Sequence, residues 1–224
     1  MTLIYRFTLV VFRLFLRYWG RYEVIGAEKL PKTGAVVVVA NHSSYLDPPL
    51  MGSSIWRVGY FMARSELWDN KFLAWYMPKL NVFAIHQGRA DRASIKKALW
   101  VLENGYVLGV FPEGTRSLDG MLNPAEPGVA LIVQKSGAPV VPMALIGAHE
   151  MLPVGATRMK HGKLTVAIGD PLFFTPDSTR EEITLAYMRA IAQLMTVNGV
   201  PMTAAEDRTS AQEKKYKDQH GSCQ

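Results

Sequence analysis

The segment at residues 41–48, NHSSYLDP, holds a histidine and an aspartate whose spacing could support general-base chemistry. In a continuous helix, side chains five residues apart diverge by about 140°. A loop, in contrast, can fold the carboxylate of Asp47 back onto an imidazole N–H of His42. Such a contact fixes the imidazole tautomer and raises its basicity, as a base acting on a hydroxyl requires. The alternative, which this segment alone favours, is that Asp47 caps a helix starting at Pro48 and His42 is an ordinary loop residue.

A second segment, FPEGTRS at residues 111–117, has the residue types of an anion-binding loop. Gly114 permits a tight turn and close approach of backbone N–H groups. Arg116 offers a bidentate fork for a phosphate. Glu113 could bind a polar group of a ligand or hold the loop. Composition alone fits equally well a simple turn with a surface arginine.

Both segments follow apolar runs that predict buried strands. The run at 35–40, AVVVVA, precedes the first segment, and a run at 107–111 leads into the second. In open α/β sheets, ligands bind beyond the carboxyl ends of the strands. We therefore predict that the His–Asp pair and the anion-binding loop face one cleft, a combination more specific than either segment alone.

The remaining periodicity predicts strands that alternate with helices, which indicates an α/β domain with a central, largely parallel sheet flanked by helices. Further strands are expected at 58–62, 82–85, 140–145 and 164–168. Helices are expected at 69–77, 91–104, 127–136 and from about 178 to 198. Asp69 would cap the helix at 69–77, and Asp177 or Ser178 would cap the last helix. We expect three parts: residues 1–22 as a membrane-interface helix, residues 23–200 as the catalytic domain, and residues 201–224 as a polar, disordered tail.

The N-terminal run at 3–19 predicts an amphipathic helix that lies in a membrane interface. It is slightly short for a membrane span of about 20 residues and carries Arg6, Arg13 and Arg17, which fall on one narrow face opposite apolar and aromatic residues. The alternatives are a helix that docks over the core and a tilted anchor with snorkelling arginines. The aromatic residues at 68–76 add either a membrane contact or an acyl groove, although core packing is favoured for Phe72 and Tyr76.

Composition excludes several classes of site. The net charge of +6 fits anionic lipid, nucleic acid or phosphorylated metabolites, but the arginines cluster on an apolar helix and no nucleic-acid-binding motif is present. The single cysteine, Cys223, rules out an intramolecular disulfide, and a catalytic thiol is not expected in a terminal tail. The histidines lack the spacing of zinc sites, so no metal is predicted.

The two polar segments resemble the motifs of a known family. NHSSYLD matches the N-H-x-S-x-x-D motif and FPEGTRS matches the F-P-E-G-T-R-S motif of the glycerolipid acyltransferases, whose best-known members are the 1-acyl-sn-glycerol-3-phosphate acyltransferases. The separation of about 70 residues also resembles the family, as does the APVVPM block at 138–143. The resemblance covers roughly residues 24–174 and implies a glycerol-3-phosphate acyltransferase-like fold.

The resemblance also implies roles for individual residues. His42 would be the general base and Asp47 would orient it. Gly114, Thr115 and Arg116 would bind the acceptor phosphate, with Glu113 supporting the site. Transfer would be direct, because no G-x-S-x-G nucleophile elbow is present. The donor, acyl-CoA or acyl carrier protein, would be a substrate, so no cofactor is expected.

One block departs from the family pattern. At residues 81–87, NVFAIHQ, Asn81 stands where the family has a glycine, and Gln87 stands where it has a phosphate-binding arginine. Arg89 or Arg92 could take the role of that arginine. His86 stands where the family tends to have an acid.

We expect lysophosphatidic acid as the acceptor and phosphatidic acid as the product. The alternatives are another lysolipid or polar acceptor, and a non-catalytic protein that binds acyl-CoA or lipid. Without a cleavable signal peptide, we expect a peripheral or monotopic protein on the cytoplasmic face of the cell membrane.

Overall fold

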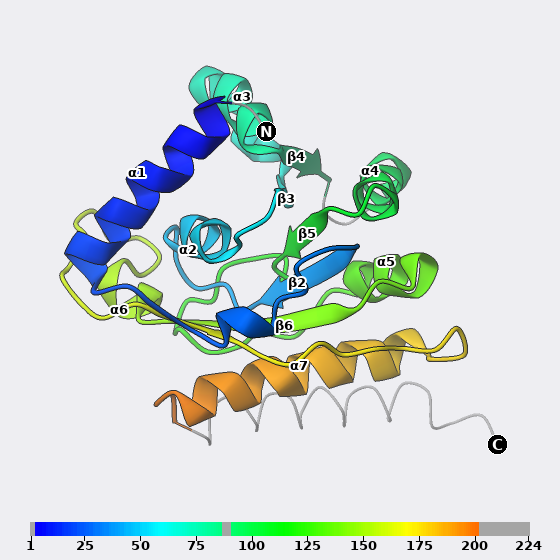
Figure 1. Ribbon diagram of the computed structural model, residues 1–224. Helices are drawn as coiled ribbons and strands as arrows, with labels where there is room; N and C mark the ends of the chain where they lie inside the picture. The colour runs from blue at the N-terminus through cyan, green and yellow to red at the C-terminus, as the bar shows by residue number, and fades with distance from the viewer. Residues whose placement is uncertain (1–2, 87–90, 202–224) are drawn as a thin grey trace.

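The computed structural model describes residues 3–86 and 91–201, which build a seven-stranded sheet between helices (Figure 1). The strand order is β1-β7-β6-β2-β5-β3-β4, and every neighbouring pair is parallel except β6 with β7. The predicted mixed, largely parallel sheet is therefore confirmed. The strands are β1 (Glu23–Ile25), β2 (Val36–Ala40), β3 (Gly59–Arg64), β4 (Val82–Ile85), β5 (Val107–Val110), β6 (Val140–Ile146) and β7 (Thr165–Ile168).

Helices cover both faces of the sheet and enclose two apolar cores. One core lies under α4, α5 and α7, and the other under α1, α2 and α6 (Figure 1). The α-helices are α1 (Leu3–Gly20), α2 (Asp47–Ser54), α3 (Lys71–Tyr76), α4 (Arg92–Glu103), α5 (Gly128–Ser136), α6 (Ala148–Met151) and α7 (Arg180–Val197), and the 3-10 helices are η1 (Ala27–Lys29), η2 (Ser65–Asp69) and η3 (Met77–Leu80).

The central strand β2 shows why its sequence is a continuous valine run. Val37 and Val39 pack into the core under α4, α5 and α7, whereas Val36 and Val38 pack into the opposite core. A strand buried on both faces cannot alternate apolar and polar residues. Strand β2 lies between β5 and β6, with Val39 opposite Val110 of β5. The carboxyl ends of β2 and β5 are therefore level, and the two polar segments leave the sheet side by side.

Three predicted helix caps are wrong. Leu46, not Asp47, precedes the first turn of α2, and the Asp47 side chain bonds no N–H of the helix that it begins. Asn70 caps α3 in place of Asp69, which lies inside η2. An N-cap residue must itself be extended and must reach an N–H two or three residues ahead. Neighbouring polar residues compete for that position, so composition alone could not choose among them.

The last helix and the first strand also differ from expectation. Thr179 caps α7 with a reciprocal capping box, in which Glu182 bonds back to the Thr179 N–H at 2.7 Å. Neither Asp177 nor Ser178 takes that place. Strand β1 was not predicted because it has only three residues and is partly exposed. It forms only when it pairs with β7 at the edge of the sheet.

Helix α1 docks on the protein by one face and leaves a second apolar face exposed. Tyr5 and Leu16 are buried, and the hydroxyl of Tyr5 accepts a hydrogen bond from the Gly59 N–H at 3.2 Å. Arg13 does not face away from the protein: its Nε donates to the Ser53 carbonyl at 2.8 Å, at the end of α2. Arg13 therefore departs from the expected stripe, because free carbonyls at a helix C-terminus attract a cation, whereas Arg6 and Arg17 are exposed.

The exposed face of α1 is apolar along its length. Its large exposed hydrophobic side chains are Leu3, Ile4, Phe7, Val10, Val11, Leu14, Phe15 and Tyr18, and Arg6 and Arg17 are exposed on the same helix. None of the helices described at residues 3–86 and 91–201 is both long and apolar enough to cross a membrane. The docking alternative accounts for the buried face of α1, whereas the interfacial placement of its other face stays a prediction.

Candidate active site

The loop between β2 and α2 brings His42 and Asp47 together. Nδ1 of His42 lies 2.8 Å from Oδ2 of Asp47, whose side chain is fully buried, while His42 keeps 16% of its side chain exposed. The same oxygen accepts hydrogen bonds from the backbone N–H groups of Ser43 and Ser44, at 2.6 and 2.7 Å. Because a carboxylate can only accept, Nδ1 carries the proton and Nε2 keeps its lone pair.

The second polar segment holds His42 from the other side. The Phe111 ring stacks on the imidazole, with 4.1 Å between centroids and 20° between planes. The His42 N–H donates to Oε1 of Glu113 at 2.7 Å, and the His42 carbonyl accepts from the Ser117 N–H at 2.7 Å. The ring and the backbone of His42 are thus both fixed by residues about 70 positions away, and the predicted convergence of the two segments is observed.

Glu113 spans three segments of the chain. It is 3% exposed, and its Oε2 accepts from the Asn123 N–H at 2.9 Å while Oε1 accepts from His42. Backbone donors on both oxygens compensate the desolvation of a buried carboxylate. The geometry therefore supports the second of the two predicted roles for Glu113, that of holding the loop.

The turn after Glu113 presents a cation next to the His–Asp pair. Gly114 has a φ of 66°, a conformation that strains any side chain, and its N–H closes the turn onto the Phe111 carbonyl at 3.1 Å. Thr115 is exposed. The Arg116 guanidinium lies over the Tyr45 ring, 3.6 Å from its centroid, and within the part of the chain that is described its buried Nη1 has no hydrogen-bond partner. An anion placed here would satisfy that donor.

Asn41 is a site residue to which sequence reasoning gave no role. Its side-chain amide donates to the Leu145 carbonyl at 3.0 Å and accepts from the Leu145 N–H at 2.7 Å. It thereby extends the pairing of β2 with β6 one residue past the last ladder pair, and ties the loop that carries His42 to β6. The available signal was the amide directly after a buried strand, because buried backbone N–H and C=O groups need partners and an amide side chain can pair with both. Phe111 was likewise quoted in a motif without a role.

Other predicted residues do not join this cluster. Arg89 and Gln87 lie outside the described residues. Arg92 is exposed at the first turn of α4, and His86 contacts Asp91, with Nδ1 to Oδ2 at 3.1 Å. Across residues 3–86 and 91–201, no three His, Cys, Asp or Glu side chains gather in a way that could hold a metal ion.

Comparison with known proteins agrees with this geometry. Residues 21–146 match the family model described as Acyltransferase. The chain is similar to a 1-acyl-sn-glycerol-3-phosphate acyltransferase of Bacillus subtilis (strain 168), at 31% identity over 75% of this chain and 82% of that protein. It is also similar to the chloroplastic 1-acyl-sn-glycerol-3-phosphate acyltransferase BAT2 of Brassica napus, at 30% identity over 67% of this chain but only 45% of that longer protein.

The fold has a solved counterpart as well. The crystal structure of the 1-acyl-sn-glycerophosphate acyltransferase PlsC from Thermotoga maritima superposes with a TM-score of 0.74 at 30% identity, over 88% of this chain and 78% of that one. The family model covers more than half of the chain and includes both polar segments. By its motifs, its fold and these similarities, the chain belongs to the acyltransferase family of enzymes.

Proposed function

We propose that this acyltransferase moves a fatty acyl group from acyl-CoA or acyl carrier protein to the sn-2 hydroxyl of 1-acyl-glycerol-3-phosphate, forming phosphatidic acid for phospholipid synthesis. The observation that carries the proposal is the 2.8 Å contact between Nδ1 of His42 and the fully buried Asp47. A buried carboxylate on one imidazole nitrogen leaves the other as a base, which an acceptor with a free hydroxyl requires.

The reaction proceeds in one transfer without an acyl-enzyme. Nε2 of His42 takes the proton of the acceptor hydroxyl as the oxygen attacks the thioester carbonyl, and a C–O bond forms. Asp47 stabilises the imidazolium. The tetrahedral intermediate then collapses and the C–S bond breaks. The thiolate leaves and takes the proton from Nε2 of His42. A thiolate is a good leaving group, so a covalent enzyme intermediate is not needed.

The anion-binding turn supports a phosphorylated acceptor. Arg116 has a buried N–H without a partner among the described residues, close to the loop that carries His42. Thr115 is exposed beside it and offers a hydroxyl. A lysophosphatidic acid headgroup would supply acceptor oxygens to both. Another phosphorylated lysolipid would satisfy the same donors, and an acceptor panel separates the two.

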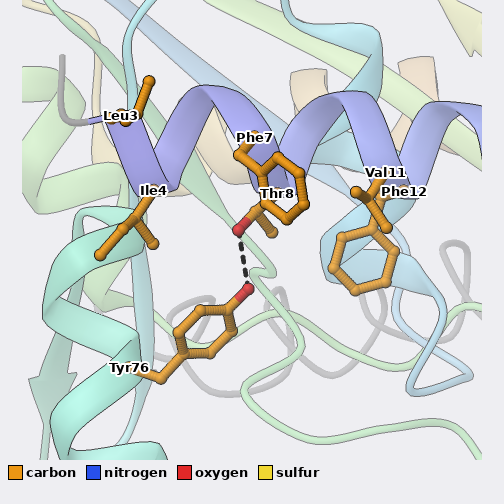
Figure 2. A pocket seen from close by; sticks show the side chains of 7 residues that line it. All are labelled: Leu3, Ile4, Phe7, Thr8, Val11, Phe12 and Tyr76. Carbon is orange, nitrogen blue, oxygen red and sulfur yellow. Dashed lines mark hydrogen bonds between the residues drawn. The ribbon is translucent and has the colours of Figure 1, made fainter.

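The exposed face of α1 supports action at a lipid surface. Phe7 and Leu14 are 68% and 64% exposed, and the face continues into a groove of about 620 Å³ between α1 and α3 (Figure 2). A hydrogen bond of 2.8 Å between the hydroxyl groups of Thr8 and Tyr76 crosses the groove. Phe72 is 62% exposed, so its expected core packing is wrong, whereas Tyr76 is half-buried. An apolar face of this extent suits the interface of a membrane. We place it at the cytoplasmic side of the cell membrane, because acyl-CoA and acyl carrier protein are cytosolic.

Thiol release tests the reaction. Purified protein in detergent is given palmitoyl-CoA with and without 1-acyl-glycerol-3-phosphate, and His42→Ala is measured alongside. We expect release that depends on the acceptor and is lost in the variant. Release with another lysolipid alone would reassign the acceptor, and activity only with acyl carrier protein would reassign the donor. No release with either donor across the panel would favour a non-catalytic lipid-binding protein.

Vesicle sedimentation tests the membrane surface. Leu14→Glu on α1 should reduce binding to vesicles of phosphatidylglycerol and phosphatidylethanolamine by several-fold, because it places a charge in the apolar face. The matched control is Val197→Glu, which lies at the end of α7 on the opposite face of the sheet and is 76% exposed (Figure 1). Equal binding by both variants and the wild type would contradict this placement of α1.

A further inference from the structure

Tyr45 occupies an unassigned position between His42 and Asp47, and its surroundings are unusual for a large aromatic residue. The side chain is 63% exposed, so burial in a core does not explain it. One face of its ring lies against the guanidinium of Arg116, at 3.6 Å from the centroid. Tyr45 belongs to the loop after β2, whereas Arg116 belongs to the loop after β5, so the contact joins the two polar segments.

The chemistry of the stack explains how it can serve ligand binding. A guanidinium on an aromatic ring uses its flat face for the cation–π interaction, while its N–H groups point outward in its own plane. The ring thus restrains the arginine without occupying its donors. In agreement, Nη1 of Arg116 is buried yet has no hydrogen-bond partner among the described residues.

We propose that Tyr45 is a positioning residue that orients Arg116 for the phosphate of the acceptor. The inference rests on the proposed function, because it takes a phosphorylated lysolipid as the ligand. Without the ring, Arg116 would sample several rotamers and would lose side-chain entropy when the phosphate binds. Since Tyr45 lies three residues from His42, the same loop couples the placement of the phosphate to the placement of the base.

Acceptor kinetics of Tyr45 variants test the proposal. Tyr45→Leu should raise KM for 1-acyl-glycerol-3-phosphate about two- to fivefold, the equivalent of one partly exposed cation–π contact, and should leave kcat and the KM for palmitoyl-CoA within about twofold. Tyr45→Phe and Tyr45→Trp keep a ring face for the guanidinium and should restore the acceptor KM. The matched control is Trp100→Leu, which removes a ring under Lys97 at 3.7 Å on α4 and should not move the acceptor KM.

A double-mutant cycle separates positioning from general packing. In an Arg116→Ala background, Tyr45→Leu should add less than about 1.5-fold to the acceptor KM, because the residue that Tyr45 orients is gone. An equal penalty in both backgrounds, an unchanged KM in Tyr45→Leu, or a Tyr45→Phe variant as weak as Tyr45→Leu would each overturn the proposal. Thermal unfolding of each variant identifies a loss of fold, and the Phe and Trp variants keep the test decisive if Tyr45→Leu is unstable.

The wild-type enzyme distinguishes failure of this inference from failure of the proposed function. If it acylates a different phosphorylated lysolipid, the proposed acceptor is wrong, and the same variants are compared on that lipid. If it acylates only acceptors without a phosphate, the role assigned to Tyr45 is overturned together with the acceptor. Normal wild-type activity on 1-acyl-glycerol-3-phosphate with no Tyr45 effect would overturn the inference alone.

Discussion

The molecule contains two His–Asp pairs with the same spacing in sequence. His42 and Asp47 follow β2, and His86 and Asp91 follow β4, both five residues apart. In each pair Nδ1 faces Oδ2, at 2.8 Å in the first and 3.1 Å in the second. Side-chain exposure separates them: 16% and 0% for His42 and Asp47, against 68% and 16% for His86 and Asp91.

The two aspartates hold different parts of the chain. Asp47 accepts from Ser43 and Ser44, which precede it, and so fixes the loop that carries His42. Asp91 also accepts from the N–H of His86, which precedes it, but its bonds with the backbone N–H and hydroxyl of Ser94, which follows it, cap α4. Strand β2 is central and β4 is at the edge of the sheet. The same spacing thus yields a histidine held by a fully buried carboxylate in one place and a helix cap in the other.

Removing the two histidines should give the largest contrast. We expect His42→Ala to lower kcat for acyl transfer by about 10²–10⁴-fold, the usual contribution of a general base. His86→Ala is the matched control and should stay within about twofold of the wild type, because its side chain is largely exposed and its partner already caps a helix. Comparable losses in the two variants would remove the distinction between the pairs.

Neutralising the aspartates should give a smaller contrast of the same kind. Asp47→Asn should lower kcat by a smaller factor than His42→Ala does, because an amide does not stabilise the imidazolium as a carboxylate does. Asp91→Asn should retain near wild-type kcat, since asparagine also caps helices well. Rates are compared at equal folded fraction, measured by circular dichroism. Full activity in Asp47→Asn would show that the buried charge is not needed.

Truncating Asp91 should affect stability rather than catalysis. Asp91→Ala removes the cap of α4 and should lower the free energy of unfolding by about 1 kcal/mol, which corresponds to a fall in Tm of about 2–4 °C for a domain of this size. The control is Asp69→Ala, since Asp69 is exposed and caps no helix, and its effect should stay within about 0.5 kcal/mol. Thermal unfolding of both variants measures the difference, and equal shifts would argue against the cap.

The pH dependence of stability should show the smallest effect. Hydrogen bonds from the Ser94 hydroxyl, the Ser94 N–H and His86 hold the pKa of Asp91 well below its ordinary value. The unfolded-state pKa, about 3.9, is therefore the higher of the two. The stabilisation is present above about pH 4 and is lost as the pH falls toward the folded-state pKa. Urea unfolding should show the advantage of wild type over Asp91→Asn shrinking below about pH 4, whereas a constant difference would contradict the shift.

The two pairs also show how far sequence reasoning reached. The pairing of His42 with Asp47 was predicted from a motif and its loop context, and it is observed. The equally spaced pair at His86 received no such prediction, because its segment matches the family motif with departures at Asn81 and Gln87. Asp47 was also considered as a helix cap, a role that it does not have, whereas the cap that Asp91 provides for α4 was not predicted.

Local patterns in the sequence determined the class of fold, most of the strands, the helix at 92–103 and the residue types of the site, because periodicity and turn chemistry act over a few neighbouring residues. Tertiary structure alone decided that β2 and β5 are neighbours in register, that Glu113 bonds the backbone of His42, that Tyr45 lies against Arg116, and that Arg13 of α1 faces inward. These contacts join residues 40 to 71 positions apart. They depend on strand order, register and helix docking, which bury groups that no local pattern marks as buried.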